Sequence, residues 1–302
     1  MSVVLVPAHT RPEFLGVTLE HLMKAKRAEQ YVYMFALDRG YDPQVLTTAK
    51  AFPLKKIILR PKDHPFAGGS YNILRGFAEA LRVLETVGGE YINLVEDDVF
   101  VAPDYFTFHE HVQTDLRPPA VSACRNQNTS RRPDLSGPEA VYYHSSYQSL
   151  GVSVRRDVVE LLVEEASDRY FANPIGYCED HYPFSSIPIG YAEQAGLARR
   201  VFERYNFQTC YAVEPRAYHA GFYGRNRPGE LLRGSLSERM RELRQMSGAE
   251  MRSRAEGYHD ITPCDMEPRV FSGLIRSGFL PRALGPSSGF VNIHAPKQEK
   301  VA

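Results

Sequence analysis

Residues 91–98 have the sequence YINLVEDD, an apolar run that ends in three adjacent carboxylates, Glu96, Asp97 and Asp98. A short apolar run of this length is typical of a buried strand. Adjacent carboxylates repel one another and are costly beside a buried segment. The stretch therefore predicts a strand over residues 91–95 whose end carries negative charge that the fold must compensate.

Strand-like and helix-like segments alternate before this stretch. The pattern predicts strands at 3–6, 31–37 and 56–59, and helices at 12–26, 42–52 and 68–85, with Asp42 as the N-cap of the second helix. Such alternation indicates βαβ units, a parallel sheet and right-handed crossovers. Ligands of these sheets bind beyond the carboxyl ends of the strands. The three carboxylates are therefore expected at the ligand-binding edge.

The second half of the chain is less regular. Strands are predicted at 120–123, 140–143 and 209–213, and helices around 109–111 and over 155–166 and 189–205. Residues 228–257 mix six arginines with glutamates, which favours a solvated helical face. The Gly-, Pro-, Ser- and Lys-rich segment 285–302 is expected to be a loosely packed tail.

Composition narrows the class of protein. With 43% hydrophobic and 24% charged residues among 302, the chain is expected to be globular. The 36 Lys and Arg balance the 36 Asp and Glu, so no global charge draws it to nucleic acid or an anionic membrane. Four cysteines without a C-x-x-C pair argue against a zinc ribbon or a disulfide framework. With no signal-peptide or transmembrane segment evident, we expect a cytoplasmic protein.

The carboxylates at 96–98 have two interpretations. Mg²⁺ or Mn²⁺ needs only one or two carboxylates if diphosphate oxygens and waters complete its octahedron. The alternative is an acidic surface turn. Nearby polar groups favour the metal: Asp38 and the loop containing His9 and Arg11 follow neighbouring strands, although each is also an ordinary turn residue. Gly69 and Ser70 open a helix, where backbone amides could bind an anion or Ser70 could simply be the N-cap.

Two motifs resemble known families. Residues 96–106, EDDVFVAPDYF, are similar to the E-D-D-x-x-x-A-P-D-F-F segment of the N-acetylglucosaminyltransferase I and protein O-mannose N-acetylglucosaminyltransferase families. Residues 4–12, VLVPAHTRP, resemble the P-x-x-N-R-P start of bacterial family-2 glycosyltransferases but depart from it at His9 and Thr10. The resemblance is good over residues 1–110 and patchy afterwards. It implies the GT-A fold, a Rossmann-like α/β fold with a central, mostly parallel sheet and a smaller acceptor-side subregion, and inverting chemistry.

The resemblance also implies roles for individual residues. Asp98 matches the metal ligand of the DXD-type motif, and Glu96 and Asp97 match residues that hold the sugar and the ribose. Asp38 matches the carboxylate that reads the nucleotide base, in a site lined by Pro7, His9 and Arg11. The implied donor is a UDP-sugar, with Mn²⁺ or Mg²⁺ as its cofactor.

An inverting transfer also needs a general base to deprotonate the acceptor hydroxyl. The resembling families place an acidic pair after an acceptor-side glycine segment and a helix, which implies Asp180, ahead of Glu179, for this role. The alternative is an ordinary pair of loop carboxylates. A late histidine, His219, is implied as a metal or diphosphate ligand, with a structural histidine as its alternative. Arg225 could grip phosphate with its guanidinium.

Other polar residues are interpreted as structural. His109 and His111 are two positions apart on a predicted helix and face apart, so they are not a zinc site. Tyr142, Tyr143 and Tyr147 could line an acceptor cleft, but packing is the favoured interpretation.

Together these features predict a metal-dependent glycosyltransferase. Residues 1–115 would form its nucleotide-sugar-binding half, 116–228 its acceptor-side and catalytic-base half, and 229–302 a charged helical segment and tail. One alternative is a nucleotidyltransferase making NDP-sugars, ranked lower because residues 7–12 contain neither Gly nor Lys. The other is a non-catalytic carbohydrate- or partner-binding module. The acceptor stays open among a glycan, a protein, a lipid and a modified nucleic-acid base, and the oligomeric state is not predicted.

Overall fold

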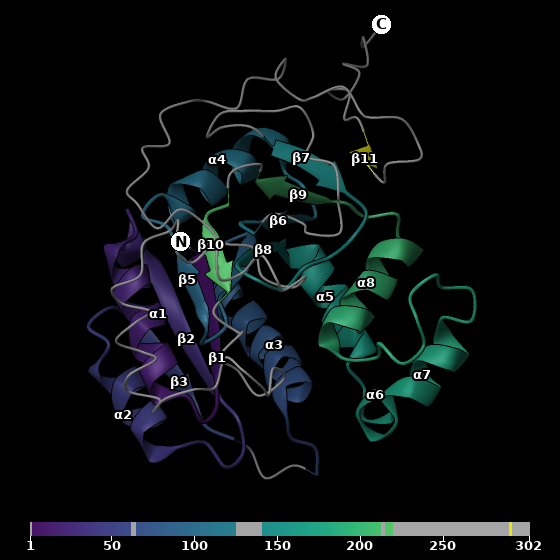
Figure 1. Ribbon diagram of the computed structural model, residues 1–302, viewed down its shortest axis with the longest axis horizontal. Helices are drawn as coiled ribbons and strands as arrows, with labels where there is room; N and C mark the ends of the chain where they lie inside the picture. The colour runs from purple at the N-terminus through teal and green to yellow at the C-terminus, as the bar shows by residue number, and fades with distance from the viewer. Residues whose placement is uncertain (1, 62–64, 125–140, 213–214, 220–289, 292–302) are drawn as a thin grey trace, which may run out of the picture.

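Nine strands form one sheet in the computed structural model, in the order β11-β7-β9-β6-β8-β4-β1-β2-β3 (Figure 1). The structure describes residues 2–61, 65–124, 141–212, 215–219 and 290–291. The strands are β1 (Ser2–Ala8), β2 (Tyr31–Leu37), β3 (Lys56–Leu59), β4 (Tyr91–Leu94), β6 (Ala120–Ser122), β7 (Val141–His144), β8 (Val152–Arg155), β9 (Thr209–Ala212) and β11 (Phe290–Val291). A second, two-stranded sheet pairs β5 (Val99–Val101) with β10 (Ala217–His219).

Helices cover both faces of the large sheet. They are α1 (Pro12–Lys24), α2 (Pro43–Ala51), α3 (Gly69–Val87), α4 (Tyr105–Leu116), α5 (Arg156–Glu165), α6 (Asp168–Ala172), α7 (Pro174–His181) and α8 (Gln194–Arg204), with a 3₁₀ turn at Ala28–Gln30. Alternate residues of β1 enter different cores. Val3 and Leu5 pack in the core that contains α3, α5 and α8, while Val4 and Val6 pack in the core with α1 and α2. The expected α/β class, a central sheet flanked by helices, is confirmed.

The sheet is less parallel than the sequence predicts. β4, β1, β2 and β3 are parallel neighbours, as the βαβ pattern requires. β8 then lies between β4 and β6 and is antiparallel to both, and β7 is antiparallel to β9. The expectation of a mostly parallel sheet is therefore wrong for the second half. β6 and β9 are parallel in this half, but β8, which was not predicted as a strand, is inserted antiparallel beside β6.

One predicted helix start differs from the structure, and another is confirmed. The helix expected from residue 189 begins only at Gln194, because Pro188 and Gly190 lie in a turn that the Tyr191 N–H closes on the Pro188 carbonyl. The buried guanidinium of Arg200 fixes this turn by donating to the Pro188 and Tyr191 carbonyls. Asp42 is confirmed as the N-cap of α2, since its side chain accepts from the Gln44 N–H.

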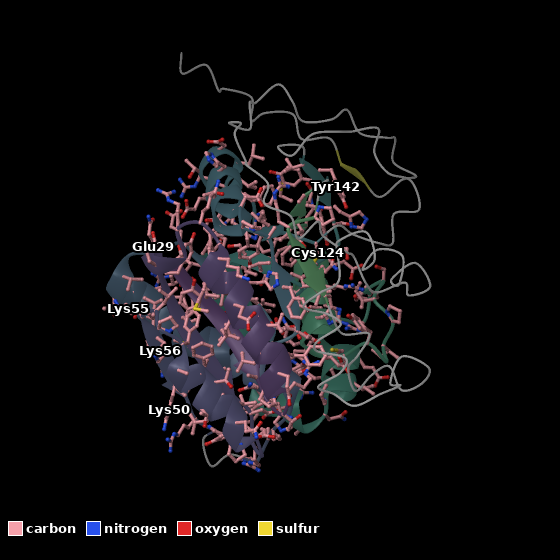
Figure 2. All side chains as sticks on the ribbon, turned by 60° about the vertical axis from the view of Figure 1, so that its left-hand side comes forward. Glu29, Lys50, Lys55, Lys56, Cys124 and Tyr142 are labelled. Carbon is pink, nitrogen blue, oxygen red and sulfur yellow. The ribbon has the colours of Figure 1, made fainter. Side chains whose placement is uncertain are left out.

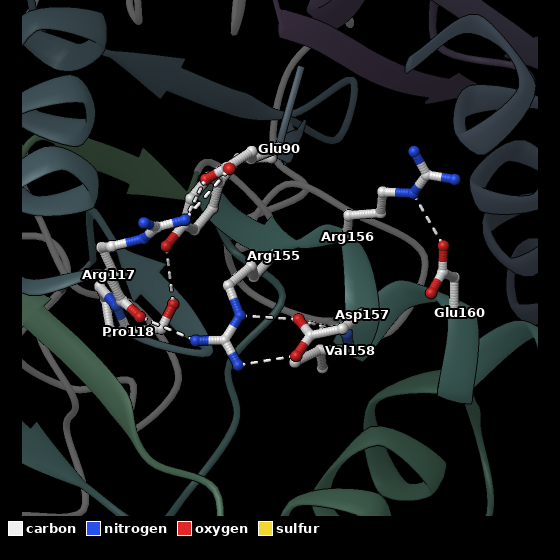
Figure 3. A network of polar contacts seen from close by, with 9 residues as sticks. Glu90, Arg117, Pro118, Arg155, Arg156, Asp157, Val158 and Glu160 are labelled. Carbon is white, nitrogen blue, oxygen red and sulfur yellow. Dashed lines mark hydrogen bonds and ion pairs between the residues drawn. The ribbon is translucent and has the colours of Figure 1, made fainter. Parts of the chain in front are cut away.

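The sheet's margins carry charged side chains. At the amino end of β4, Glu90 pairs with Arg117, while Arg155 at the end of β8 pairs with Asp157 and donates to the Arg117 carbonyl (Figure 3). These pairs are exposed and add little stability. At the edge strand β3, Lys56 is the first residue, Lys55 precedes the strand and Lys50 lies on α2 (Figure 2). A lysine on an edge strand discourages pairing with a second chain.

Three of the four cysteines lie in described segments and are buried, namely Cys124, Cys178 and Cys210, and the Cys124 thiol donates to the Ala217 carbonyl at 3.2 Å. Cys264 lies outside the described residues. Of the helices that the structure describes, none combines the length and apolar character that a membrane crossing requires.

Candidate active site at the carboxyl edge of the sheet

The acidic triplet lies in a turn between β4 and β5. The Val95 N–H still bonds to the Leu5 carbonyl, and the Val99 N–H then closes a turn on the Glu96 carbonyl. One interpretation of this stretch was an acidic surface turn. A turn does form, but its carboxylates are buried rather than exposed. Asp97 and Asp98 are each only 3% exposed. Two carboxylates are thus held in the protein interior at the carboxyl edge of the sheet.

Arg11 compensates part of this buried negative charge. Its guanidinium donates to Asp98 Oδ2 at 2.6 Å and also ion-pairs with Asp97. Arg11 immediately precedes α1, and Thr18 in the same helix donates to the Asp97 backbone carbonyl at 2.8 Å. The family resemblance implied that Arg11 lines the nucleotide base. In the structure its charged end lies on the acidic turn instead.

His219 reaches the turn from β10, more than a hundred residues later in the chain. β10 pairs with β5 so that His219 is opposite Val99, and its Nε2 lies 3.3 Å from Asp98 Oδ2. Asp98 Oδ1 and His219 Nδ1 are both buried and have no hydrogen-bond partner among the described residues. A buried polar atom without a partner is costly. Asp98 and His219 therefore each keep one buried polar atom, Oδ1 and Nδ1, without a partner among the described residues.

The charges at the turn do not balance. Burial raises the pKa of the Glu96 carboxyl to about 7, with repulsion from Asp98 adding to the shift. Burial also raises the pKa of Asp97 to about 6, although Arg11 opposes that shift. Burial alone would raise the pKa of Asp98, but His219 and Arg11 outweigh it and hold that pKa below its usual range. Three carboxylates thus face two cationic groups, Arg11 and His219. The excess negative charge contributes to the raised pKa of Glu96.

The residues partly fit a divalent cation. Mg²⁺ or Mn²⁺ can be held by one carboxylate if a ligand's phosphate oxygens and waters supply the other positions. Asp98 Oδ1 could supply the carboxylate ligand, and the His219 imidazole could supply a second ligand. Among the residues that the structure describes, however, no group of three or more His, Cys, Asp or Glu side chains is arranged to hold a metal by itself. Any cation here would depend on oxygens from a bound ligand.

The neighbouring strand end carries Asp38 and His9. Asp38 is buried, and its Oδ1 accepts from the Gly68 N–H at 3.1 Å and from the Arg39 N–H at 2.8 Å. It thereby ties the end of β2 to the start of α3. His9 Nε2 lies 2.9 Å from the Arg39 carbonyl. Pro7 lies within β1, which ends at the same edge.

Gly69 and Ser70 form the first turn of α3. A side-chain carbon added at Gly69 would meet no atom within 4 Å, so the backbone here faces open space. Gly68 is the N-cap, with a φ of 103° that favours glycine. The alternative in which Ser70 caps the helix is therefore wrong. Its hydroxyl instead accepts from the Gln194 N–H at 3.0 Å and joins α3 to α8.

Glu179 and Asp180 are not assembled with the acidic turn. They lie on α7, a short helix that the sequence does not predict and that lies beyond α8 at the right of Figure 1, whereas β10 lies near the middle. Both are exposed, and Asp180 forms a 2.5 Å ion pair with Arg169, which is itself exposed. Arg225 lies outside the described residues.

The remaining candidates pack as expected. Tyr142, Tyr143 and Tyr147 are buried, and His109 is buried beside Tyr105. Four further polar residues are buried and have no role in the sequence-based prediction, namely Thr18, Asp104, Gln194 and Arg216. An isolated polar residue inside an otherwise ordinary helix or loop has no distinct sequence signal.

Comparisons with known proteins assign no family. No protein-family model matches the chain, and no curated protein matches it. Among solved structures, TarS residues 1–349 from S. aureus in complex with UDP matches with a TM-score of 0.47 and 12% identity, covering 79% of this chain and 77% of that one. TarS 1–349 without a named ligand matches with a TM-score of 0.46 and 14% identity, covering 85% and 72%.

A cytidylyltransferase from Leptospira borgpetersenii serovar Hardjo-bovis matches with a TM-score of 0.35 and 15% identity, covering 61% of this chain and 73% of that one. At these identities and TM-scores, the likenesses carry no argument about what this chain binds or catalyses.

Proposed function

We propose that the protein is a glycosyltransferase that moves a sugar from a nucleoside-diphosphate donor, with a UDP-sugar as the favoured donor, to an acceptor hydroxyl. One observation carries the proposal: carboxylates are buried at the carboxyl edge of the sheet, and Asp98 and His219 each keep a buried polar atom without a partner in the part of the chain that the structure describes. A fold tolerates such groups where a charged ligand completes them. This edge is also where α/β sheets bind their ligands.

Different residues of the chain would bind different parts of the donor. Asp38 would contact the base from the end of β2, beside His9 and Pro7. The amides at Gly69 and Ser70 open α3, and helix starts attract anions. Glu96 and Asp97 would hold the sugar and ribose hydroxyls as hydrogen-bond acceptors. Arg11 would keep the carboxylates of the turn in place.

Asp98 and His219 would hold a Mn²⁺ or Mg²⁺ ion together with the donor's phosphate oxygens. When bound, the ion would offset the negative charge that develops on the leaving diphosphate. We also propose an inverting transfer, in which one residue of the chain takes the acceptor's proton. Asp180 remains the proposed base. Since it is exposed and paired with Arg169, it would have to exchange that partner for the acceptor hydroxyl.

The direct test is release of UDP from UDP-sugars by the full chain with Mn²⁺ and an acceptor mixture. Asp98→Ala is compared with Asp157→Ala, a control at the opposite margin of the sheet. We expect the rate of UDP release to fall on the order of 10²-fold or more in Asp98→Ala and not at all in the control. Removing one electrostatic contact from an active site lowers the rate by about that factor. Full activity of Asp98→Ala would refute the site. Release of pyrophosphate from a nucleoside triphosphate and a sugar phosphate would instead identify a nucleotidyltransferase.

A further inference from the structure

A fully buried ion pair, Asp104–Arg216, lies at one end of the two-stranded sheet that carries His219 at its other end. Arg216 Nε donates to Asp104 Oδ2 at 3.1 Å, and both side chains are 0% exposed. Neither residue touches the proposed donor site. Asp104 is the N-cap residue of α4, where an aspartate commonly accepts from the helix's own amides. Here its side chain makes no such bond and is directed to Arg216 instead.

The pairing of β5 with β10 depends on a very short ladder. Ala217 is opposite Val101 and His219 is opposite Val99, over three residues in each strand. A two-stranded pair of this length is marginal on its own. A slip by one residue would turn every side chain of β10 to the other face. His219 would then point away from Asp98.

Arg216, which immediately precedes β10, makes four contacts. Its N–H donates to the Ala123 carbonyl at 2.7 Å, and its carbonyl accepts from the Ala102 N–H at 3.0 Å. Its guanidinium pairs with Asp104 and also lies over the Phe108 ring at 4.3 Å. A buried ion pair adds little stability compared with apolar packing, and its best-attested use is to specify register.

We propose that Asp104 and Arg216 are positioning residues that set the register of β10 and thereby hold His219 beside Asp98. The inference rests on the proposed function for the role of His219, but the register itself is a property of the fold. Removing the pair should therefore loosen β5 and β10 first, and should weaken donor binding only through His219.

The first test is amide hydrogen exchange of the full chain, comparing Arg216→Met with Arg200→Met. Arg200 is an equally buried arginine that holds the turn before α8, so it controls for general destabilisation. In Arg216→Met we expect amides of β5 and β10 to exchange on the order of 10-fold faster, with β1 and β2 unchanged, because local openings have their own free energy. Equal acceleration in both variants, or in β1 and β2, would overturn the inference. If Arg216→Met fails to fold, Asp104→Asn is compared with Arg200→Met in the same way.

The second test is a double-variant cycle on UDP affinity measured with Mn²⁺. Arg216→Met and His219→Ala should each weaken UDP binding by similar factors, and the combined variant should bind no more weakly than His219→Ala alone. Losses that multiply would show that Arg216 does not act through His219 and would overturn the inference. If the wild-type chain binds no UDP, the proposed function fails, and hydrogen exchange still decides whether the pair sets the register.

Discussion

Replacing Arg11 with methionine should destabilise the protein, because it removes the guanidinium that compensates Asp97 and Asp98 while keeping most of the apolar stem. The side chains of Asp97 and Asp98 are each only 4% exposed, whereas the Arg11 side chain is 31% exposed. Removing one partner of a fully buried ion pair costs about 3–5 kcal/mol, and an exposed pair contributes about 0–1 kcal/mol. Since Arg11 is partly solvated, we expect a loss intermediate between these limits, about 2 kcal/mol.

The assay is urea denaturation at neutral pH in the presence of a chelator. Arg27→Met is the matched control, because Arg27 pairs with Glu110 at a more exposed position, with side chains 51% and 27% exposed. It should cost less than about 1 kcal/mol. Mn²⁺ added together with UDP should then stabilise Arg11→Met more than the wild type, since the cation replaces the missing charge. If Arg11→Met loses no more stability than Arg27→Met, the acidic turn is not a strained, charge-compensated site and the reasoning fails.

Three further perturbations have defined outcomes. Asp180→Asn should lower transfer on the order of 10²-fold with UDP affinity unchanged if it is the base, and unchanged kinetics would exclude it. Burial lowers the pKa of His109 to about 3, so its stabilising contribution is full above pH 6.5 and is lost as the pH falls. From pH 7.5 to pH 5, denaturation should show the wild type losing about 2 kcal/mol more than His109→Phe, and parallel losses would contradict this. Gly76→Ala would bring a carbon to 2.7 Å from Leu5 Cδ1 and should cost about 1–3 kcal/mol of unfolding free energy. Gly190→Ala, with open space, is its control, and an equal cost at both sites would argue against the packing.

The βαβ half was predictable because its signals are long and local. β2 and β3 have the predicted bounds, and α2 begins after its predicted cap at Asp42. β2 is buried along its whole length and is therefore continuously apolar. β5 and β10 were not predicted. Three residues are too few to show a period, and their pairing joins positions more than a hundred residues apart.

The candidate site was predictable in composition more than in arrangement. The run of carboxylates at 96–98 identified the acidic turn, and His219 does lie beside Asp98. The sequence could not show that Arg11 lies on the carboxylates, since that contact depends on how α1 packs against the turn. It also could not separate Asp180 from the turn, because nothing local specifies that α7 forms or where it docks.

The most direct measurement of the central claim is calorimetric titration of UDP into the full chain with and without Mn²⁺, repeated with Asp98→Ala. The account predicts that UDP binds the wild type, that Mn²⁺ strengthens the binding at least about 10-fold, and that Asp98→Ala abolishes the effect of the metal. UDP affinity that is unaffected by both Mn²⁺ and Asp98→Ala, or absent in the wild type, would contradict the assignment of the acidic turn as a nucleotide-sugar site.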